Sequence, residues 1–149
     1  MQLTLHTDYS LRVLIYLAQK GEEMATISEI ADFYKISRNH LVKVVHHLSS
    51  EGFIHTSRGK NGGMRLARAP ELISVGEVVQ CMEPNFDIVE CFSNDKPGCT
   101  VAPICSLKGV LYQAGREFLA ILNRYTLADA INPALAAKQQ IFPVEWLNP

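Results

Sequence analysis

Three cysteines in the second half of this 149-residue chain are close enough in sequence to bind one metal centre. Cys91, Cys99 and Cys105 form the pattern C-x7-C-x5-C within residues 85–105, a stretch without a helix or strand pattern. A loop of this length in a compact domain usually has a function such as ligand binding. Thiolates are soft ligands that suit iron–sulfur clusters or zinc, but zinc sites usually contain a C-x2-C pair, which is missing here. The spacing therefore favours an iron–sulfur cluster.

The residue types and their spacing do not identify the fourth ligand of such a cluster. Cys81 is one candidate, although its place beside Met82 in a predicted helix favours its interpretation as a small core cysteine. A carboxylate from elsewhere in the chain is another candidate. Fewer than four thiolates from the loop would leave one iron more open to attack, which suits a sensor. Three unrelated buried cysteines, a disulfide switch and a zinc site are the alternatives.

A second group of polar residues lies on a helix that Ser37 should cap and Gly52 should end. The apolar residues of this helix recur at i, i+3, i+4 and i+7, which predicts a buried face. They are Leu41, Val44, Val45 and Leu48. The opposite face carries residue types that contact DNA bases and phosphates, namely Arg38, Asn39, His40, Lys43, His46 and His47. The first residues of a recognition helix usually contact bases, so Lys43, one turn further on, is expected at a phosphate.

The elements before this helix predict a helix-turn-helix. A first helix should begin at Asp8, with Thr7 as its cap, and end at Gly21; a second should be capped by Ser28. A turn of a few residues joins the second helix to the third, which is helix-turn-helix spacing. The apolar stripe of the first helix is predicted to be Leu11, Leu14, Ile15 and Ala18.

Residues 53–67 predict a β-hairpin, which after a helix-turn-helix forms a wing. Two strand-like runs flank the glycine-rich loop Ser57–Gly63, where Arg58 and Lys60 could enter a minor groove. A nucleotide-binding loop is excluded because the order G-x-x-x-x-G-K-[ST] is missing. The residues expected at the DNA are Ser28, Ser37, Arg38, Asn39, His40, Lys43, Arg58, Lys60 and Asn61.

The distribution of charge favours a polyanion as the partner of the first half. The net charge of the chain is −1, but residues 35–70 hold seven cations and one anion, whereas residues 71–149 hold five cations and nine anions. All five histidines lie within residues 6–55, so no base accompanies the cysteine loop. A cysteine nucleophile needs such a base. The sequence therefore predicts a DNA-binding regulator rather than an enzyme or an electron carrier.

The composition and the chain start predict a folded cytoplasmic protein. Apolar residues make up 48% of the chain, which is enough for a core, and no apolar run approaches the length of a membrane span. The first ten residues lack the basic and apolar regions of a secretory signal. In a reducing compartment, cysteines are more often metal ligands or redox groups than disulfides.

The second half is predicted to contain a dimerisation helix. Ser74 should cap a short helix that Pro84 ends, and a long helix should run from residue 106 to about residue 130. Its residues at spacings of 4, 3, 4, 3 and 4 form a heptad seam, which needs a partner such as a second copy of the chain. They are Leu107, Leu111, Ala114, Phe118, Ile121 and Tyr125.

The expected fold class is mainly α with one small β-hairpin. We expect a winged helix-turn-helix over residues 1–83 with its wing at about 53–67, a cluster-binding loop over 84–105, a dimerisation helix over 106–130 and a tail of unknown role over 131–149.

Four motifs of the chain resemble one family of regulators. They are Leu3–Leu17 (LTLHTDYSLRVLIYL), Ile36–Leu48 (ISRNHLVKVVHHL), Arg58–Leu66 (RGKNGGMRL) and Glu83-Pro84 followed by the three cysteines and Leu107. Over about residues 1–130 the chain resembles the iron–sulfur winged-helix repressors of the IscR/NsrR type, and within them the nitric-oxide-sensing NsrR branch. The wing and the cysteine loop together are fairly specific to this family. The first cysteine spacing is longer than in several members.

This resemblance implies a homodimeric repressor of a palindromic operator in double-stranded DNA. It implies an iron–sulfur cluster, [4Fe–4S] in preference to [2Fe–2S], bound by Cys91, Cys99 and Cys105, with Asp8 of the partner subunit as the fourth ligand. Nitric oxide would nitrosylate the iron and lower the affinity for DNA. IscR-like members use a histidine shortly after the third cysteine, and no histidine follows Cys105 here. Sensing of iron–sulfur status or redox state is the alternative within the family.

Overall fold

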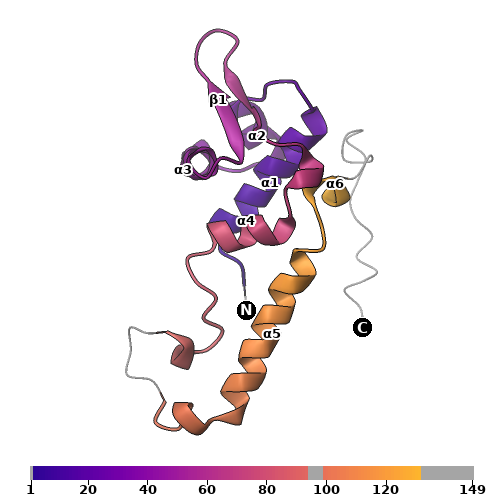
Figure 1. The fold of residues 1–149 in the computed structure, drawn as a ribbon. Helices are drawn as coiled ribbons and strands as arrows, with labels where there is room; N and C mark the ends of the chain where they lie inside the picture. The colour runs from indigo at the N-terminus through magenta and orange to yellow at the C-terminus, as the bar shows by residue number, and fades with distance from the viewer. Residues whose placement is uncertain (1, 94–98, 132–149) are drawn as a thin grey trace.

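The computed structural model describes residues 2–93 and 99–131, which form a head of helices with one β-hairpin and a long helix that extends from it (Figure 1). The helices are α1 (Leu5–Lys20), α2 (Ile27–Tyr34), α3 (Arg38–Ser50), α4 (Val75–Met82), α5 (Ser106–Leu122) and α6 (Leu127–Ala130). The strands are β1 (Ile54–Ser57) and β2 (Gly63–Leu66), and short 3₁₀ turns lie at Pro70–Leu72, Glu90–Phe92 and Ala102–Ile104. The prediction of a mainly helical chain with one small hairpin is confirmed.

Helix α1 begins earlier than the sequence predicts. Its N-cap is Thr4, whose hydroxyl accepts a hydrogen bond of 3.3 Å from the backbone N of Thr7. The prediction of Thr7 as the cap is therefore wrong. The backbone N of Thr4 donates to the carboxylate of Glu83 at 2.6 Å. This contact with a distant residue gives the helix start a partner that local sequence does not reveal.

The buried face of α1 is also rotated from the predicted one. Leu14 is buried as expected, but Leu11, Ile15 and Ala18 are only half-buried. The buried residues of this helix are Thr7, Ser10, Val13, Leu14 and Leu17. The two buried hydroxyl residues fall on the same face as the buried aliphatic residues, and for this reason hydrophobicity alone misplaces the stripe.

Helices α2 and α3 form the predicted helix-turn-helix, with one cap corrected. Thr26, and not Ser28, caps α2, because Thr26 and Glu29 form a capping box. Lys35 adopts a left-handed conformation (φ 57°) and turns the chain between the helices. Ser37 precedes α3 at the cap position, but its side chain forms no cap hydrogen bond. The predicted buried stripe of α3 is confirmed at all four positions, Leu41, Val44, Val45 and Leu48.

The β-hairpin is tied to the head through its second strand. Strands β1 and β2 pair antiparallel, with Ile54 opposite Leu66. The backbone of Met64 also pairs with that of Ala25 in the connection between α1 and α2, with N–O distances of 2.8 and 3.0 Å. A Cβ on Gly63 would lie 2.7 Å from the carbonyl oxygen of Ala25, so this close approach requires glycine.

The long helix predicted over residues 106–130 is wrong at its C-terminal end. Helix α5 ends at Leu122, and Thr126 begins the separate α6 with a capping box of its own. The backbone around the start of α6 pairs with the backbone around the start of α4: Val75 N donates to Tyr125 O at 2.8 Å, and Leu127 N donates to Ile73 O at 2.9 Å. These long-range hydrogen bonds hold the backbone after Leu122 in a non-helical conformation, so α5 ends there.

The core of the head includes a residue from beyond α5. Leu127 of α6 is fully buried in the same cluster as Leu14, Leu48, Phe53 and Val78. The chain therefore leaves the head after α4, runs through the cysteine loop and α5, and returns to complete the core (Figure 1). None of the helices in the described ranges is long and apolar enough to cross a membrane.

Candidate nucleic-acid interface and cysteine loop

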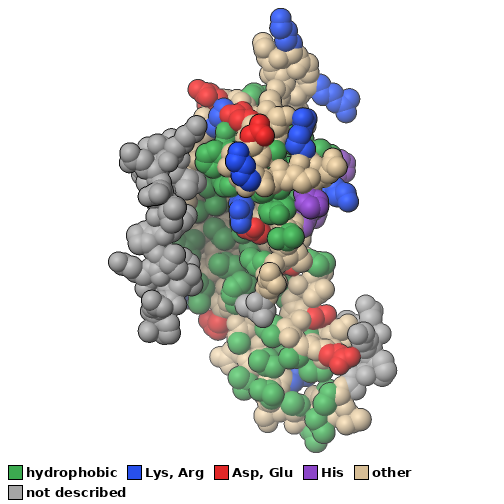
Figure 2. Space-filling view, turned by 180° about the vertical axis from the view of Figure 1, so that it is seen from behind, with side chains coloured by type: hydrophobic (Ala, Val, Ile, Leu, Met, Phe, Trp, Pro, Cys, Tyr) green, Lys and Arg blue, Asp and Glu red, His purple; other side chains and the backbone are tan. Residues whose placement is uncertain are grey.

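The polar face of α3 lies on the surface of the head. Ser37, Arg38, Asn39, His40 and Lys43 are all exposed, because the opposite face packs its aliphatic residues into the core. Figure 2 shows that Lys, Arg and His side chains gather at the hairpin end of the molecule, whereas the far end carries mainly hydrophobic side chains. Ser28 is half-buried on α2, outside this exposed group.

The tip of the hairpin carries the other predicted DNA contacts. Arg58, Lys60 and Asn61 are exposed on the loop between β1 and β2, and the hairpin projects from the head (Figure 1). Gly59, between the two cations, has a φ of 110°, a conformation that L side chains rarely adopt. The tight loop therefore presents both cations with little side-chain bulk between them.

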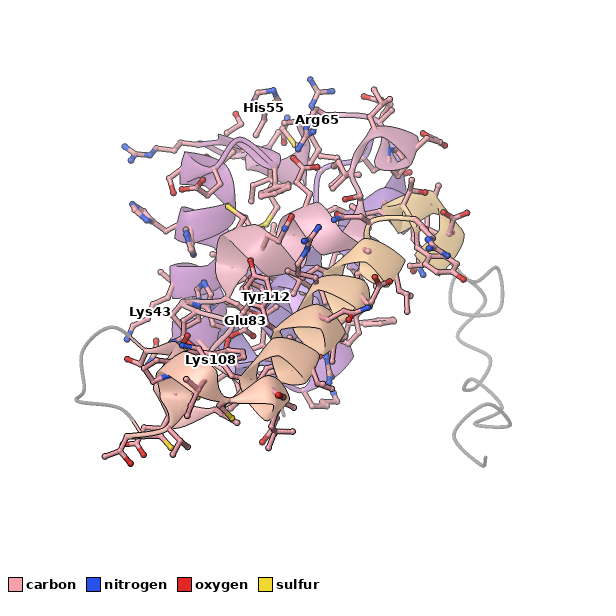
Figure 3. All side chains as sticks on the ribbon, turned by 60° about the horizontal axis from the view of Figure 1, so that its bottom comes forward. Lys43, His55, Arg65, Glu83, Lys108 and Tyr112 are labelled. Atoms are coloured by element: carbon pink, nitrogen blue, oxygen red, sulfur yellow. The ribbon has the colours of Figure 1, made fainter. Side chains whose placement is uncertain are left out.

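The cations of the head fall into two groups: those that form ion pairs with carboxylates of the head and those that do not. Arg65 binds Glu22 at 2.9 Å, and Arg68 binds Glu77 at 2.7 Å. Arg65 lies beside His55 on the outer face of the hairpin (Figure 3). Within residues 2–93 and 99–131, the cations that form no ion pair include Arg38, Lys43, Arg58 and Lys60. The charges of α3 and the wing tip are therefore free to bind an external anion such as DNA phosphate.

The cysteine loop runs along the far end of α5. Cys91 is half-buried, Cys105 is half-buried immediately before α5, and Cys99 is exposed; all three are free thiols. Cys91 lines a cavity of about 450 Å³ between the loop and α5, together with Lys108 and Tyr112, which Figure 3 labels. The described residues contain no group of three His, Cys, Asp or Glu side chains placed to hold a metal ion, so the structure does not gather the cysteines around one point.

Asp8 lies in the first turn of α1, and its carboxylate forms an ion pair with a residue of the same helix. Arg12 contacts both carboxylate oxygens of Asp8, at 3.0 Å through Nε and at 2.8 Å through a terminal nitrogen. Both side chains remain partly exposed, at 39% for Asp8 and 43% for Arg12. The carboxylate is therefore accessible to a second chain, but it would have to exchange Arg12 for another partner.

Cys81 is separate from the other three cysteines in position and chemistry. Its Sγ donates to the carboxylate of Glu51 at 3.2 Å. Burial, followed by the hydrogen bond and charge of Glu51, raises the pKa of Cys81 to about 11. A thiol with a raised pKa gives up its proton to a metal ion less readily than an ordinary thiol, which agrees with the interpretation of Cys81 as a structural cysteine.

This environment makes Cys81 a slow nucleophile. A rise of its pKa to about 11 leaves a roughly 100-fold smaller thiolate fraction at pH 8 than an unperturbed thiol has. We expect iodoacetamide to modify Cys81 of the cluster-free protein at least about tenfold more slowly than the exposed Cys99, as followed by peptide mass spectrometry. Replacing Glu51 with glutamine should speed the reaction at Cys81. Equal rates in the parent and in this variant would contradict the assigned role of Glu51.

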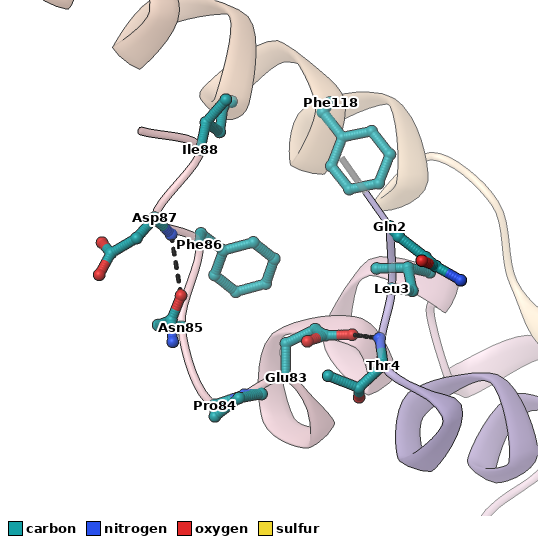
Figure 4. A pocket seen from close by; sticks show the side chains of 11 residues that line it. Gln2, Leu3, Thr4, Glu83, Pro84, Asn85, Phe86, Asp87, Ile88 and Phe118 are labelled. Atoms are coloured by element: carbon teal, nitrogen blue, oxygen red, sulfur yellow. Dashed lines mark hydrogen bonds between the residues drawn. The ribbon is translucent and has the colours of Figure 1, made fainter. Parts of the chain in front are cut away.

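Sequence reasoning missed the polar contacts that join α1 to α3 and α4. Glu83 meets Thr4 at the rim of an apolar pocket of about 240 Å³ that Phe86 and Phe118 also line (Figure 4). Nε2 of His6 lies 2.9 Å from Nδ1 of His47. Burial, and then the neighbouring His47, lower the pKa of His6, while Glu83 acts in the opposite direction. These pairs are 79 and 41 residues apart in the chain, so no local pattern reveals them.

Helix α5 carries an apolar stripe without a partner in the described chain. It has no buried residue, and Leu107, Val110 and Ile121 are 62, 62 and 50% exposed. The heptad seam predicted for this helix is only partly exposed. Leu107 and Ile121 are exposed, whereas Leu111 and Phe118 are half-buried against the same chain. Exposed apolar side chains that follow one another along a helix are typical of an association site.

Comparison with known proteins gives consistent matches over most of the chain. The model of the Rrf2 family, described as an iron-dependent transcriptional regulator, matches residues 3–133. The HTH-type transcriptional regulator NsrR of Bacillus licheniformis is 52% identical over 132 residues, which cover 88% of this chain and 92% of that protein. NsrR of Bacillus subtilis is 49% identical over 132 residues, which cover 88% and 90% of the two chains.

Two solved structures share the fold. The global cysteine regulator CymR of B. subtilis matches with a TM-score of 0.71 at 23% identity, over 94% of this chain and 99% of that one. T. potens IscR matches with a TM-score of 0.71 at 24% identity, over 97% and 96% of the two chains. The predicted resemblance to regulators of the IscR/NsrR type is confirmed.

Proposed function

Because the chain belongs to the Rrf2 family of transcriptional regulators, we propose that it is a homodimeric repressor whose cysteine loop binds an iron–sulfur cluster and which releases its operator on exposure to nitric oxide. As a member of this family it is a DNA-binding transcription regulator and not an enzyme. The cytoplasm remains its predicted compartment.

One observation carries the proposal: three free thiols lie on the segment that connects a basic reading head to a helix with an exposed apolar stripe. A ligand bound there would contact the segment that joins α4 to α5. Its loss can therefore alter how the two heads of a dimer are held relative to each other. A change of about 1.4 kcal/mol in this arrangement is enough for a tenfold change in DNA affinity.

The donor set of the loop fits an iron–sulfur cluster. Cys91, Cys99 and Cys105 offer three soft ligands without a C-x2-C pair, and none of them is in a disulfide. Asp8 of the partner subunit would complete the set with an oxygen, which binds iron more weakly than a thiolate does. A bound cluster, [4Fe–4S] in preference to [2Fe–2S], would supply iron that reacts with nitric oxide. The protein would supply a fourth ligand that leaves easily.

The head would read DNA through α3 and the wing. In a dimer, two copies of α3 would enter successive major grooves, about 34–36 Å apart. Arg38, Asn39 and His40 would contact base edges, and Lys43 would contact a phosphate. Arg58 and Lys60 would contact the flanking minor groove from the wing, with Asn61 beside them.

The proposal is tested on protein purified without oxygen. Iron, sulfide and the absorbance near 400 nm (a general feature of thiolate-bound clusters) are measured during titration with nitric oxide. In parallel, the affinity is measured for a DNA fragment that the loaded protein selects from a random library. We expect a brown dimer that loses its colour and its DNA affinity together. A colourless protein with zinc, or with no metal, would contradict the cluster and leave a winged-helix regulator with another signal.

Replacing Asp8 with alanine should separate the fourth ligand from the other three. We expect most of the iron and sulfide to remain, because three thiolates remain, but the response to nitric oxide or the DNA affinity should change. Titration of the variant beside Asp32→Ala, which removes an exposed carboxylate from α2, measures this difference. Responses identical to those of the parent protein would leave Asp8 only its contact with Arg12.

Replacing Arg58 with alanine should weaken operator binding without a change in the absorbance spectrum. The exposed guanidinium forms no ion pair within the described residues, so its loss costs contacts with DNA and little stability. A loss of about 5- to 100-fold in affinity is expected for one such contact. Arg124→Ala, which removes an exposed cation near the end of α5, serves as the control. An unchanged affinity of Arg58→Ala would remove the wing tip from the interface.

A further inference from the structure

The first turn of α1 contacts the recognition helix at two places. His6 forms its hydrogen bond with His47 near the end of α3, where the ring centroids are 5.1 Å apart. Tyr9, three residues later in α1, has its ring centroid 6.2 Å from that of His40 near the start of α3. Contacts at both ends of α3 mean that a shift of this turn must move the helix or break a contact.

The contact of His6 with His47 continues into α4. Nε2 of His47 lies 4.0 Å from one carboxylate oxygen of Glu51, and the other oxygen accepts the hydrogen bond from Cys81. His6 and Glu51 therefore approach different nitrogens of the His47 ring. Together with Cys81, these side chains form a row that joins α1, α3 and α4. They do not converge on one point, and the described residues contain no group of three such side chains placed to hold a metal ion. The row positions helices and does not form a metal site.

The same turn of α1 is connected to both parts of the proposed cluster site. Thr4, its N-cap, is bound by Glu83, and residue 84 begins the cysteine loop of the same chain. Asp8, the proposed ligand for the partner's cluster, lies on the turn between His6 and Tyr9. A displacement of the cysteine loop would reach this turn through the hydrogen bond between Glu83 and Thr4. A displacement of Asp8 would move the turn directly, because Asp8 is part of it.

We propose that His6 and His47 are positioning residues that transmit the state of the cluster site to the recognition helix. This inference rests on the proposed function. The hydrogen bond between the two rings holds α3 in its DNA-binding position while Asp8 and the cysteine loop hold the first turn of α1 in place. When the turn is released, the bond no longer holds α3 in that position.

The test measures the ratio of operator affinities between cluster-loaded and cluster-free protein. In allosteric proteins such a ratio is typically about 5- to 150-fold. His47→Phe and His6→Phe keep an aromatic ring but remove the hydrogen bond, and His55→Phe, which changes an exposed histidine on β1 outside the residues expected at the DNA, is the control. Each of the first two variants should keep its iron content and lower the ratio by about 2- to 30-fold. The double variant should lower it no further, because either single change removes the same bond.

Two results would overturn the inference. One is a parental ratio in both His6→Phe and His47→Phe, even if both affinities fall, because this would mean that the rings act only on folding or on DNA contact. The other is an equal fall of the ratio in His55→Phe. Two independent variants keep the test valid if one does not fold. A parent protein without a cluster, or with equal affinities in both states, would instead contradict the proposed function.

Discussion

Cys99→Ala is expected to remove the cluster from protein purified without oxygen. Cys99 is the middle thiol of the loop and is exposed and free, and its side chain forms no hydrogen bond with the described residues. With two thiolates left, the iron and sulfide content should fall from the parental value to near zero. Operator affinity should fall at least about tenfold, or about 1.4 kcal/mol, because the cluster proposed to hold the two heads of a dimer in place would be lost.

Cys81→Ala is the matched control for this experiment. It removes a thiol of the same chain, but one that donates its hydrogen bond to Glu51 and stays protonated. Its iron and sulfide content should equal that of the parent protein. Normal iron and sulfide in Cys99→Ala would exclude Cys99 as a ligand, and loss of the cluster in Cys81→Ala would reverse the roles assigned to the two thiols.

Gly76→Ala is expected to be the most destabilising of these single changes. Gly76 is buried near the start of α4, and a Cβ there would lie 2.8 Å from the backbone N of Asn123, at the end of α5. Helix propensity alone would favour alanine by about 1 kcal/mol. The clash outweighs this gain, because it pushes away the backbone that pairs Val75 with Tyr125. We expect a net loss of about 1–3 kcal/mol in the free energy of unfolding.

Thermal unfolding of Gly76→Ala and Gly109→Ala checks this prediction. Gly109 is also in a helix, α5, but a Cβ added there meets nothing within 4 Å. Its substitution should be neutral or raise stability by up to about 1 kcal/mol. The melting temperature of Gly76→Ala should fall by about 3–15 °C. A melting temperature above that of the parent protein would mean that α5 adjusts without cost, and that the joint between α4 and α5 is loose.

Local patterns predicted the exposed polar face of α3 and the hairpin well. The stripe of Leu41, Val44, Val45 and Leu48 is buried, and this burial alone places the opposite face of α3 in solvent. The hairpin followed from strand-like runs around a glycine-rich loop. These features depend on residues within about two helical turns or one hairpin of each other, which is the range over which periodicity and turn chemistry act.

The errors arose where distant segments of the chain meet. Thr4 caps α1 with the help of Glu83, and the break after α5 depends on pairing of Tyr125 and Leu127 with the segment before α4. The contact of His6 with His47 was missed for the same reason, because it joins residues that are 41 positions apart in the chain. For the proposed cluster site, the spacing of the three cysteines predicts a ligand set, but the described residues do not gather these thiols around one point; in the proposed dimer the geometry would also depend on the carboxylate of the partner's Asp8.

The burial of Leu127 in the head has a consequence for the order of events during synthesis. The ribosome makes the first 83 residues before the loop and α5, yet the core of the head is complete only when Leu127 has emerged. At 5–20 residues per second this interval lasts about 2–9 s. A nascent chain therefore cannot finish its head before its cysteine loop and α5 exist, so every finished head is made together with the parts that are proposed to control it.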